Sequence, residues 1–155
     1  MCGIVGYAGF HKKTSLNAAI ESICHRGPDD QGTAYFDGIA LGNVRLSIID
    51  LSPRGGQPMF NADKTLCITF NGEIYNFKET KKVLEKKYKF KSHSDTEVVL
   101  YAYQEWGEKC LEKFNGMFSF VIYDRRKKLL FGARDRLGQK PLKYYFDNNV
   151  FIFAS

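Results

Sequence analysis

Short runs in which apolar and polar residues alternate are the feature of this chain that most restricts its fold. Leu66, Ile68 and Phe70 occupy every second position of one run, with threonine or cysteine beside them. A period of two residues is typical of a β-strand with one buried face. The other strand-like runs are 3–8, 33–42 with an Asp-Gly turn at 37–38, 118–122, 129–131 and 150–153. The chain is therefore expected to be built largely from antiparallel hairpins.

Three segments between these runs have the apolar periodicity of helices, namely 15–25, 77–88 and 95–106. The last begins with Ser94-Asp95-Thr96-Glu97, whose spacing matches a capping box. Strands in succession with inserted helices predict an α+β fold with antiparallel sheets and helices outside. With 155 residues the chain has the length of one domain, 1–155. Because it stops directly after an apolar run, we expect this domain to be part of a longer protein.

Composition excludes several classes of function. The net charge is +6, but the lysines of 78–87 are interleaved with glutamates, and 125–128 has the character of an exposed turn, so we expect no nucleic-acid partner. No apolar stretch approaches the roughly 18 residues of a membrane span, and the N-terminus lacks the layout of a secretion signal, so we expect no membrane association. Four dispersed cysteines without a C-x-x-C pair indicate neither a metal site nor a disulfide scaffold and favour a cytoplasmic location.

Cys2, the second residue of the chain, is a candidate nucleophile. A cysteine thiol has a pKa of about 8.5 and needs a nearby base to act as a nucleophile at neutral pH. If Met1 is removed, Cys2 supplies its own α-amine, and α-amines titrate near about 8. One residue would then provide nucleophile and base, which is the N-terminal form of nucleophilic activation. A cysteine at such a position is otherwise a small buried apolar residue.

Four further positions carry polar groups beside strand-like or helical runs. Arg45 begins an apolar stretch, and its guanidinium suits a carboxylate, although an arginine at a strand end is often only solvated. Asn71-Gly72 follows Phe70; such a pair is commonly a turn, yet it can place an amide and an N–H side by side as an oxyanion hole. Glu73 and Asp95 could hold an ammonium group, although a carboxylate at a helix start is favoured by the helix dipole alone.

Together these groups would recognise an amino acid with a reactive side-chain carbonyl, and glutamine is the obvious candidate. The residues are scattered between positions 2 and 95, and their spacing alone does not group them. They are grouped by the resemblance of the chain to a known family. Seven motifs carry this resemblance, in this order along the chain: Cys2-Gly3-Ile4-Val5-Gly6, His25-Arg26-Gly27-Pro28-Asp29, Arg45-Leu46-Ser47-Ile48-Ile49-Asp50-Leu51, Gln57-Pro58-Met59, Phe70-Asn71-Gly72-Glu73-Ile74-Tyr75-Asn76, Ser94-Asp95-Thr96-Glu97-Val98 and Arg134-Asp135-Arg136-Leu137-Gly138-Gln139-Lys140-Pro141-Leu142.

Over nearly its whole length the chain closely resembles the N-terminal glutaminase domain of glutamine-dependent asparagine synthetases, which are class II amidotransferases and N-terminal-nucleophile hydrolases. The resemblance implies a four-layer αββα sandwich of two antiparallel sheets flanked by helices. It also implies roles. Cys2 is similar to the nucleophile, Arg45 to the residue that binds the α-carboxylate, and Arg26 to a supporting residue near the thiol. The remaining implied sites are the oxyanion hole of Asn71 and Gly72 and the α-ammonium site of Glu73, Asp95 and the carbonyls of Ile48 and Ile49.

The resemblance implies that the domain releases ammonia from L-glutamine and that a C-terminal synthetase domain uses it with ATP to make asparagine from aspartate. This chain has no S-G-G-x-D-S or Walker-type loop, so we expect no cofactor or metal in it, and ATP and Mg²⁺ only in the synthetase domain. A homodimer of the full-length protein is compatible with the resemblance. Two alternatives stay open: the same glutaminase could serve another acceptor, or the domain could be a catalytically silent regulatory module, although every expected site residue is present.

Overall fold

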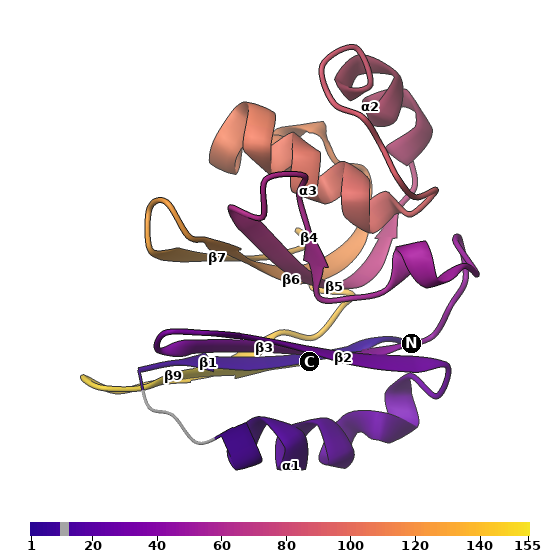
Figure 1. Ribbon diagram of the computed structural model, residues 1–155. Helices are drawn as coiled ribbons and strands as arrows, with labels where there is room; N and C mark the ends of the chain where they lie inside the picture. The colour runs from indigo at the N-terminus through magenta and orange to yellow at the C-terminus, as the bar shows by residue number, and fades with distance from the viewer. Residues whose placement is uncertain (10–12) are drawn as a thin grey trace.

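The computed structural model describes residues 1–9 and 13–155, and in this part of the chain two antiparallel sheets are stacked face to face (Figure 1). The first sheet has the order β2-β3-β1-β9-β8, with β1 (Gly3–Ala8), β2 (Asp30–Phe36), β3 (Ile39–Arg45), β8 (Lys143–Phe146) and β9 (Phe151–Ala154). The second sheet has the order β4-β5-β6-β7, with β4 (Met59–Phe60), β5 (Leu66–Ile74), β6 (Gly116–Asp124) and β7 (Leu129–Arg134).

Helices cover the two outer faces, so the predicted α+β sandwich with four layers is confirmed. Helix α1 (Lys13–Ile23) lies against the first sheet, while α2 (Phe77–Leu84) and α3 (Asp95–Trp106) lie over the second (Figure 1). Three 3₁₀ segments complete the structure: η1 (Cys24–Arg26), η2 (Pro53–Gly55) and η3 (Gly107–Lys113). None of the helices in 1–9 and 13–155 is long and apolar enough to cross a membrane.

Side chains of one parity point into the space between the sheets. Ile4 from β1, Leu41 from β3 and Cys67 from β5 belong to one buried cluster there. Because side chains alternate across a strand, the positions two residues away along each strand face the same space. Cys2, Asn43, Thr69 and Asn71 therefore share this inner face. The alternation of side chains along β1, β3 and β5 therefore places the Cys2 thiol and the Asn71 side chain on the same side, in the space between the sheets.

Several boundaries differ from the sequence-based expectations. The expectation of one buried face was wrong for β5. Cys67 and Thr69 are both fully buried, because the first sheet covers the face that was expected to be solvated. The helix at 95–106 is confirmed, whereas the one expected at 77–88 ends at Leu84 and the first one lies at 13–23. Strands β4 and β8 were not predicted. All four cysteines are free thiols.

The start of α3 also differs from the predicted capping box. Ser94 caps the helix, with its Oγ accepting from the Thr96 N–H at 3.1 Å. The Glu97 carboxylate does not return to Ser94; it accepts from the N–H groups of Lys91 and Ser92 at 2.9 Å and 2.7 Å. These hydrogen bonds attach the segment before α3 to the first turn of the helix. They thereby fix the position of Asp95, the first residue of α3, in the cavity wall.

Candidate active site

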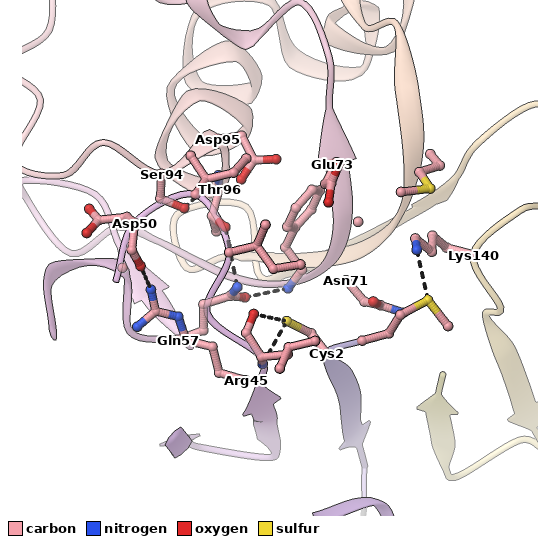
Figure 2. A pocket seen from close by; sticks show the side chains of 18 residues that line it. Cys2, Arg45, Asp50, Gln57, Asn71, Glu73, Ser94, Asp95, Thr96 and Lys140 are labelled. Carbon is pink, nitrogen blue, oxygen red and sulfur yellow. Dashed lines mark hydrogen bonds between the residues drawn. The ribbon is translucent and has the colours of Figure 1, made fainter. Parts of the chain in front are cut away.

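A cavity of about 270 Å³ opens at one end of the space between the sheets, and eight of the nine residues predicted for the site line it (Figure 2). These eight are Cys2, Arg45, Ile48, Ile49, Asn71, Gly72, Glu73 and Asp95. In Figure 2, Arg45 and Asp50 lie on one side of the cavity and Lys140 on the opposite side, with Cys2 and Asn71 between them. Residues that are 93 positions apart in the chain thus share one small space.

Cys2 lies directly before β1 and is held on both of its sides. Its Sγ lies 3.4 Å from the Leu46 nitrogen and 3.5 Å from the Leu46 carbonyl oxygen. Arg26 lies outside the cavity lining, and its Nε and Nη2 donate to the Cys2 carbonyl at 3.2 Å and 3.1 Å. Arg26 therefore fixes the backbone that carries the thiol. Met1 precedes Cys2 and lines the cavity, with its Sδ 2.9 Å from the Lys140 Nζ.

The pairing of β5 explains why this strand offers free N–H groups to the cavity. The Arg125 N–H donates to the Thr65 carbonyl and the Tyr75 N–H to the Asn115 carbonyl, so the odd-numbered residues of β5 bond to β6. The N–H groups of even-numbered residues point to the other side, where β4 lies. Strand β4 has only two residues and pairs with Ile68 and Cys67. Beyond Ile68, none of the strands in residues 1–9 and 13–155 pairs with this edge of β5.

Along that open edge, side-chain oxygens accept hydrogen bonds from two of the three N–H groups. Gln57 Oε1 accepts from Phe70 N at 2.7 Å, and Asp95 Oδ2 accepts from Ile74 N at 3.0 Å. The Gly72 N–H lies between them and faces the cavity that Gly72 lines. A backbone donor at the edge of a sheet, held on both sides by neighbouring hydrogen bonds, is a fixed group of the kind that an oxyanion hole requires.

Asn71 and Gly72 are fixed in place by close packing. The Asn71 side chain is 1% exposed, and its Nδ2 donates to Ser155 Oγ at 3.4 Å. At Gly72 a Cβ atom would overlap the Met117 carbonyl oxygen and lie 2.6 Å from the Phe118 Cα. Only glycine fits at this position. Asn71 and Gly72 lie within β5, so the expectation of a turn at the end of a strand was wrong.

Arg45 is anchored to the loop that follows it. Its Nη1 donates to the Ser52 carbonyl at 3.2 Å and its Nη2 to the Asp50 carbonyl. The guanidinium has five N–H donors, so further donors are left for a ligand. A Cβ atom at Gly55 would overlap the Arg45 Nη2, so this glycine makes room for the guanidinium. Arg45 is 7% exposed and lies where a ligand in the cavity could meet it.

The Asp50 carboxylate fixes the same loop to the segment before α3. Although desolvation by burial acts in the opposite direction, hydrogen bonds from Ser52 and from the His93 N–H lower the pKa of Asp50 to about 2. Its two oxygens accept from the Ser52 N–H at 2.9 Å and the His93 N–H at 2.8 Å. A carboxylate held this way stays ionised at any physiological pH, so the loop is attached permanently.

Two acidic side chains line the wall opposite the thiol. Asp95 is 4% exposed, and burial, with a smaller contribution from the charge of Glu73, raises its pKa to about 6. An ionised carboxylate with so little solvent gains strongly from a cation placed beside it. Ile48 and Ile49 lie at the mouth of the cavity and are 58% and 36% exposed.

Sequence reasoning missed several residues that complete the site. Gln57, Ser94, Thr96, Met117 and Lys140 all line the cavity. The motif around Gln57 and the block 134–142 had been noted as part of the resemblance, but their roles depend on hydrogen bonds between distant segments. For Ser94 and Thr96 the signal was the helix cap, which identified a helix start and not a cavity wall.

The fold and this cavity define a class of domain that uses an N-terminal cysteine on a two-sheet sandwich. The description "Glutamine amidotransferase domain" belongs to the family that matches residues 1–155, and the chain is a member of that family. A solved structure, the glutamine phosphoribosylpyrophosphate amidotransferase of Bacillus subtilis, superposes with a TM-score of 0.83 over 99% of this chain and 41% of that one. At 21% identity, this likeness supports the fold.

Several of the similar curated proteins are glutamine-hydrolysing asparagine synthetases. The chain is 43% identical to putative asparagine synthetase 2 of Methanocaldococcus jannaschii, in a match that covers all of this chain and 34% of the relative. It is 42% identical to asparagine synthetase 1 of Bacillus subtilis, again over all of this chain and 26% of the relative. The chain thus spans about a quarter to a third of the length of these relatives. It is a glutamine amidotransferase domain related to glutamine-hydrolysing asparagine synthetases.

Proposed function

We propose that the domain hydrolyses L-glutamine to glutamate and ammonia through a thioester on Cys2. The observation that carries this proposal is the shared cavity. Cys2, Asn71 and Gly72 line the same cavity as Arg45 and Asp95. A nucleophile, two donors for an oxyanion, a cation and a buried carboxylate are the groups needed to bind glutamine and cleave its side-chain amide.

Glutamine would be oriented by its α-amino and α-carboxylate groups. The remaining N–H groups of Arg45 suit the carboxylate, because the guanidinium fork matches two oxygens. Glu73 and Asp95, with the backbone carbonyls of Ile48 and Ile49, would receive the α-ammonium. Since Asp95 is buried, the ammonium would replace the solvation that this carboxylate lacks. The side-chain amide would then reach toward Cys2.

The reaction follows from these positions once Met1 has been removed. The free α-amine of Cys2 accepts the thiol proton, and the sulfur attacks the side-chain carbonyl carbon of glutamine. The carbonyl oxygen becomes an oxyanion, which the Asn71 amide and the Gly72 N–H stabilise. The C–N bond breaks, the leaving nitrogen takes the proton from the amine and departs as ammonia, and a thioester remains. Water adds to the thioester, and glutamate and the free thiol are released.

We further propose that the ammonia is used by a synthetase domain of the longer protein to convert aspartate to asparagine. The names and lengths of the curated relatives support this destination. Any ATP and Mg²⁺ that this synthesis requires would bind the synthetase domain, since this chain lacks S-G-G-x-D-S and Walker-type phosphate-binding loops. Transfer of ammonia to aspartate, compared with other carboxylate acceptors in the full-length protein, tests the destination.

Release of glutamate from glutamine, measured on protein whose intact mass shows that Met1 is absent, tests the hydrolysis. Cys2→Ala should abolish it and leave the thermal unfolding temperature unchanged. Cys24→Ala is the matched control, because this thiol is exposed and does not line the cavity, and it should keep the wild-type rate. Wild-type activity in the Cys2 variant would refute the mechanism.

A further inference from the structure

Gln57 is a buried residue for which the proposed mechanism has no role, although its side chain makes three hydrogen bonds in the cavity wall. It is 8% exposed. Its Oε1 accepts from Phe70 N at 2.7 Å and from Asn43 Nδ2 at 3.3 Å, and its Nε2 donates to Thr96 Oγ1 at 3.3 Å. One amide thereby joins β3 of the first sheet, β5 of the second sheet and the first turn of α3, as Figure 2 shows in part.

The register of β4 on β5 shows what this side chain replaces. Met59 pairs with Ile68, so the position opposite Phe70 in the same antiparallel ladder is residue 57. The chain leaves the sheet there, and the Gln57 side-chain oxygen accepts the hydrogen bond that a backbone carbonyl of β4 would otherwise take. The next N–H along this edge belongs to Gly72. Gln57 therefore ends the ladder one step before the N–H that faces the cavity.

We propose that Gln57 is a positioning residue that aims the Gly72 N–H and the Asn71 amide at the oxyanion. This inference rests on the proposed glutamine hydrolysis. By holding Phe70 N, Gln57 sets the position of the peptides that follow it. Its contacts with Asn43 and Thr96 tie that position to the sheet that carries Cys2 and to the helix that carries Asp95. Gln57 thus contributes to the distance between the nucleophile and the oxyanion donors.

Asn61 provides a matched control at the other end of the same short ladder. It lies opposite Leu66, and its Oδ1 accepts from Leu66 N at 2.9 Å. It is 3% exposed, and it is absent from the cavity lining. Asn61 and Gln57 thus make the same kind of side-chain bond to β5, at opposite ends of the ladder, and only Gln57 adjoins the proposed oxyanion hole.

The test compares Gln57→Leu, Gln57→Glu and Asn61→Leu in the whole chain with Met1 removed. Both leucine variants leave one buried N–H of β5 without its acceptor, so both should lower the urea midpoint of unfolding by a similar amount. Gln57→Leu should lower kcat by about 10- to 100-fold with KM changed less than about twofold, because a small misplacement of oxyanion donors affects the transition state. Asn61→Leu should keep kcat within about twofold of wild type.

Gln57→Glu keeps the oxygen that accepts from Phe70 N, and its kcat should exceed that of the leucine variant at least about fivefold. If Gln57→Leu does not fold, Gln57→Met takes its place, since a thioether of similar length is only a weak acceptor. Glutamate γ-semialdehyde gives a second readout. Its aldehyde adds to the thiol to form a tetrahedral adduct with an oxyanion, so Gln57→Leu should weaken its inhibition about tenfold or more and leave inhibition by glutamate unchanged.

The outcomes separate the two proposals. If wild-type protein does not hydrolyse glutamine, the proposed function fails, and the positioning role fails with it. If the wild type is active while Gln57→Leu and Asn61→Leu have equal kcat, only the positioning role is refuted. An equal loss of affinity for semialdehyde and glutamate would also overturn it, because Gln57 would then support the whole cavity and not the oxyanion donors.

Discussion

Replacing Asp95 by asparagine should make the protein more stable at neutral pH while weakening its binding of glutamine. Asp95 is 4% exposed, and burial raises its pKa from 3.8 to about 6, with the charge of Glu73 adding to the effect. Hydrogen bonds from Ile74 N and Thr96 N oppose this change without reversing it. The ionised carboxylate is thus a cost to the empty folded protein, which an α-ammonium in the cavity would offset.

The magnitude follows from the two pKa values. A folded-state pKa above the unfolded value means that the folded protein binds more protons between about pH 4 and 6, so stability falls as the pH rises through that window. With 3.8 unfolded and about 6 folded, ionisation of Asp95 costs about 3 kcal/mol at pH 7.5 and about 1 kcal/mol at pH 4.5. Asparagine is neutral at both, so the stability gained should be about 2 kcal/mol larger at pH 7.5.

Urea unfolding of wild type and Asp95→Asn at the two pH values measures this difference directly. Effects of the substitution that do not depend on pH, such as altered contacts with Ile74 N, cancel between the two conditions. The same variant should raise KM for glutamine, because its side chain no longer offers a charge to the α-ammonium. A change in unfolding free energy that is the same at both pH values would refute the reasoning about burial, and an unchanged KM would remove Asp95 from the binding site.

Three other substitutions or modifications test separate parts of the cavity in the glutamate-release assay. Asn71→Ala should lower kcat by about 10²–10³, the loss of one oxyanion donor, and an unchanged kcat would exclude the Asn71 amide as such a donor. Gly55→Ala should raise KM for glutamine about tenfold or more, because its Cβ displaces the Arg45 guanidinium; wild-type KM would show that the carboxylate binds elsewhere. A permanent extension before Cys2 should abolish activity by converting the α-amine to an amide, and an active extended protein would exclude the amine as base.

Elements whose burial and sequence pattern agree could be predicted from the sequence. Helix α3 was predicted with its observed bounds because a cap residue and an apolar stripe coincide there. Strand β8 was missed because it is exposed throughout and is a strand only through its pairing with β9. The two residues of β4 are too few to show any period. The burial of both faces of β5 was missed because Thr69 is polar, although the space between the sheets encloses it.

The residues of the site likewise divide into those that the sequence could predict and those that it could not. Cys2, Arg45 and Asn71 could be selected from the sequence because their chemistry is distinctive and a resemblance groups them. The contribution of Gln57 could not, since it depends on the place where β4 leaves the sheet and on partners in three elements. The anchoring of Arg45 by backbone carbonyls, and of the following loop by Asp50, is likewise a property of loop geometry that no residue type reveals.

The central claim is that one sulfur, among four thiols, attacks the side-chain carbon of glutamine. Covalent labelling with the glutamine analogue 6-diazo-5-oxo-L-norleucine, followed by intact mass and peptide mapping, tests it most directly. We predict one adduct per chain, located on Cys2, formed only after Met1 is removed and prevented by excess glutamine. The buried thiols of Cys67 and Cys110, whose pKa values burial raises to about 12, should stay unmodified. Labelling at another cysteine, or equal labelling of protein that retains Met1, would contradict the account.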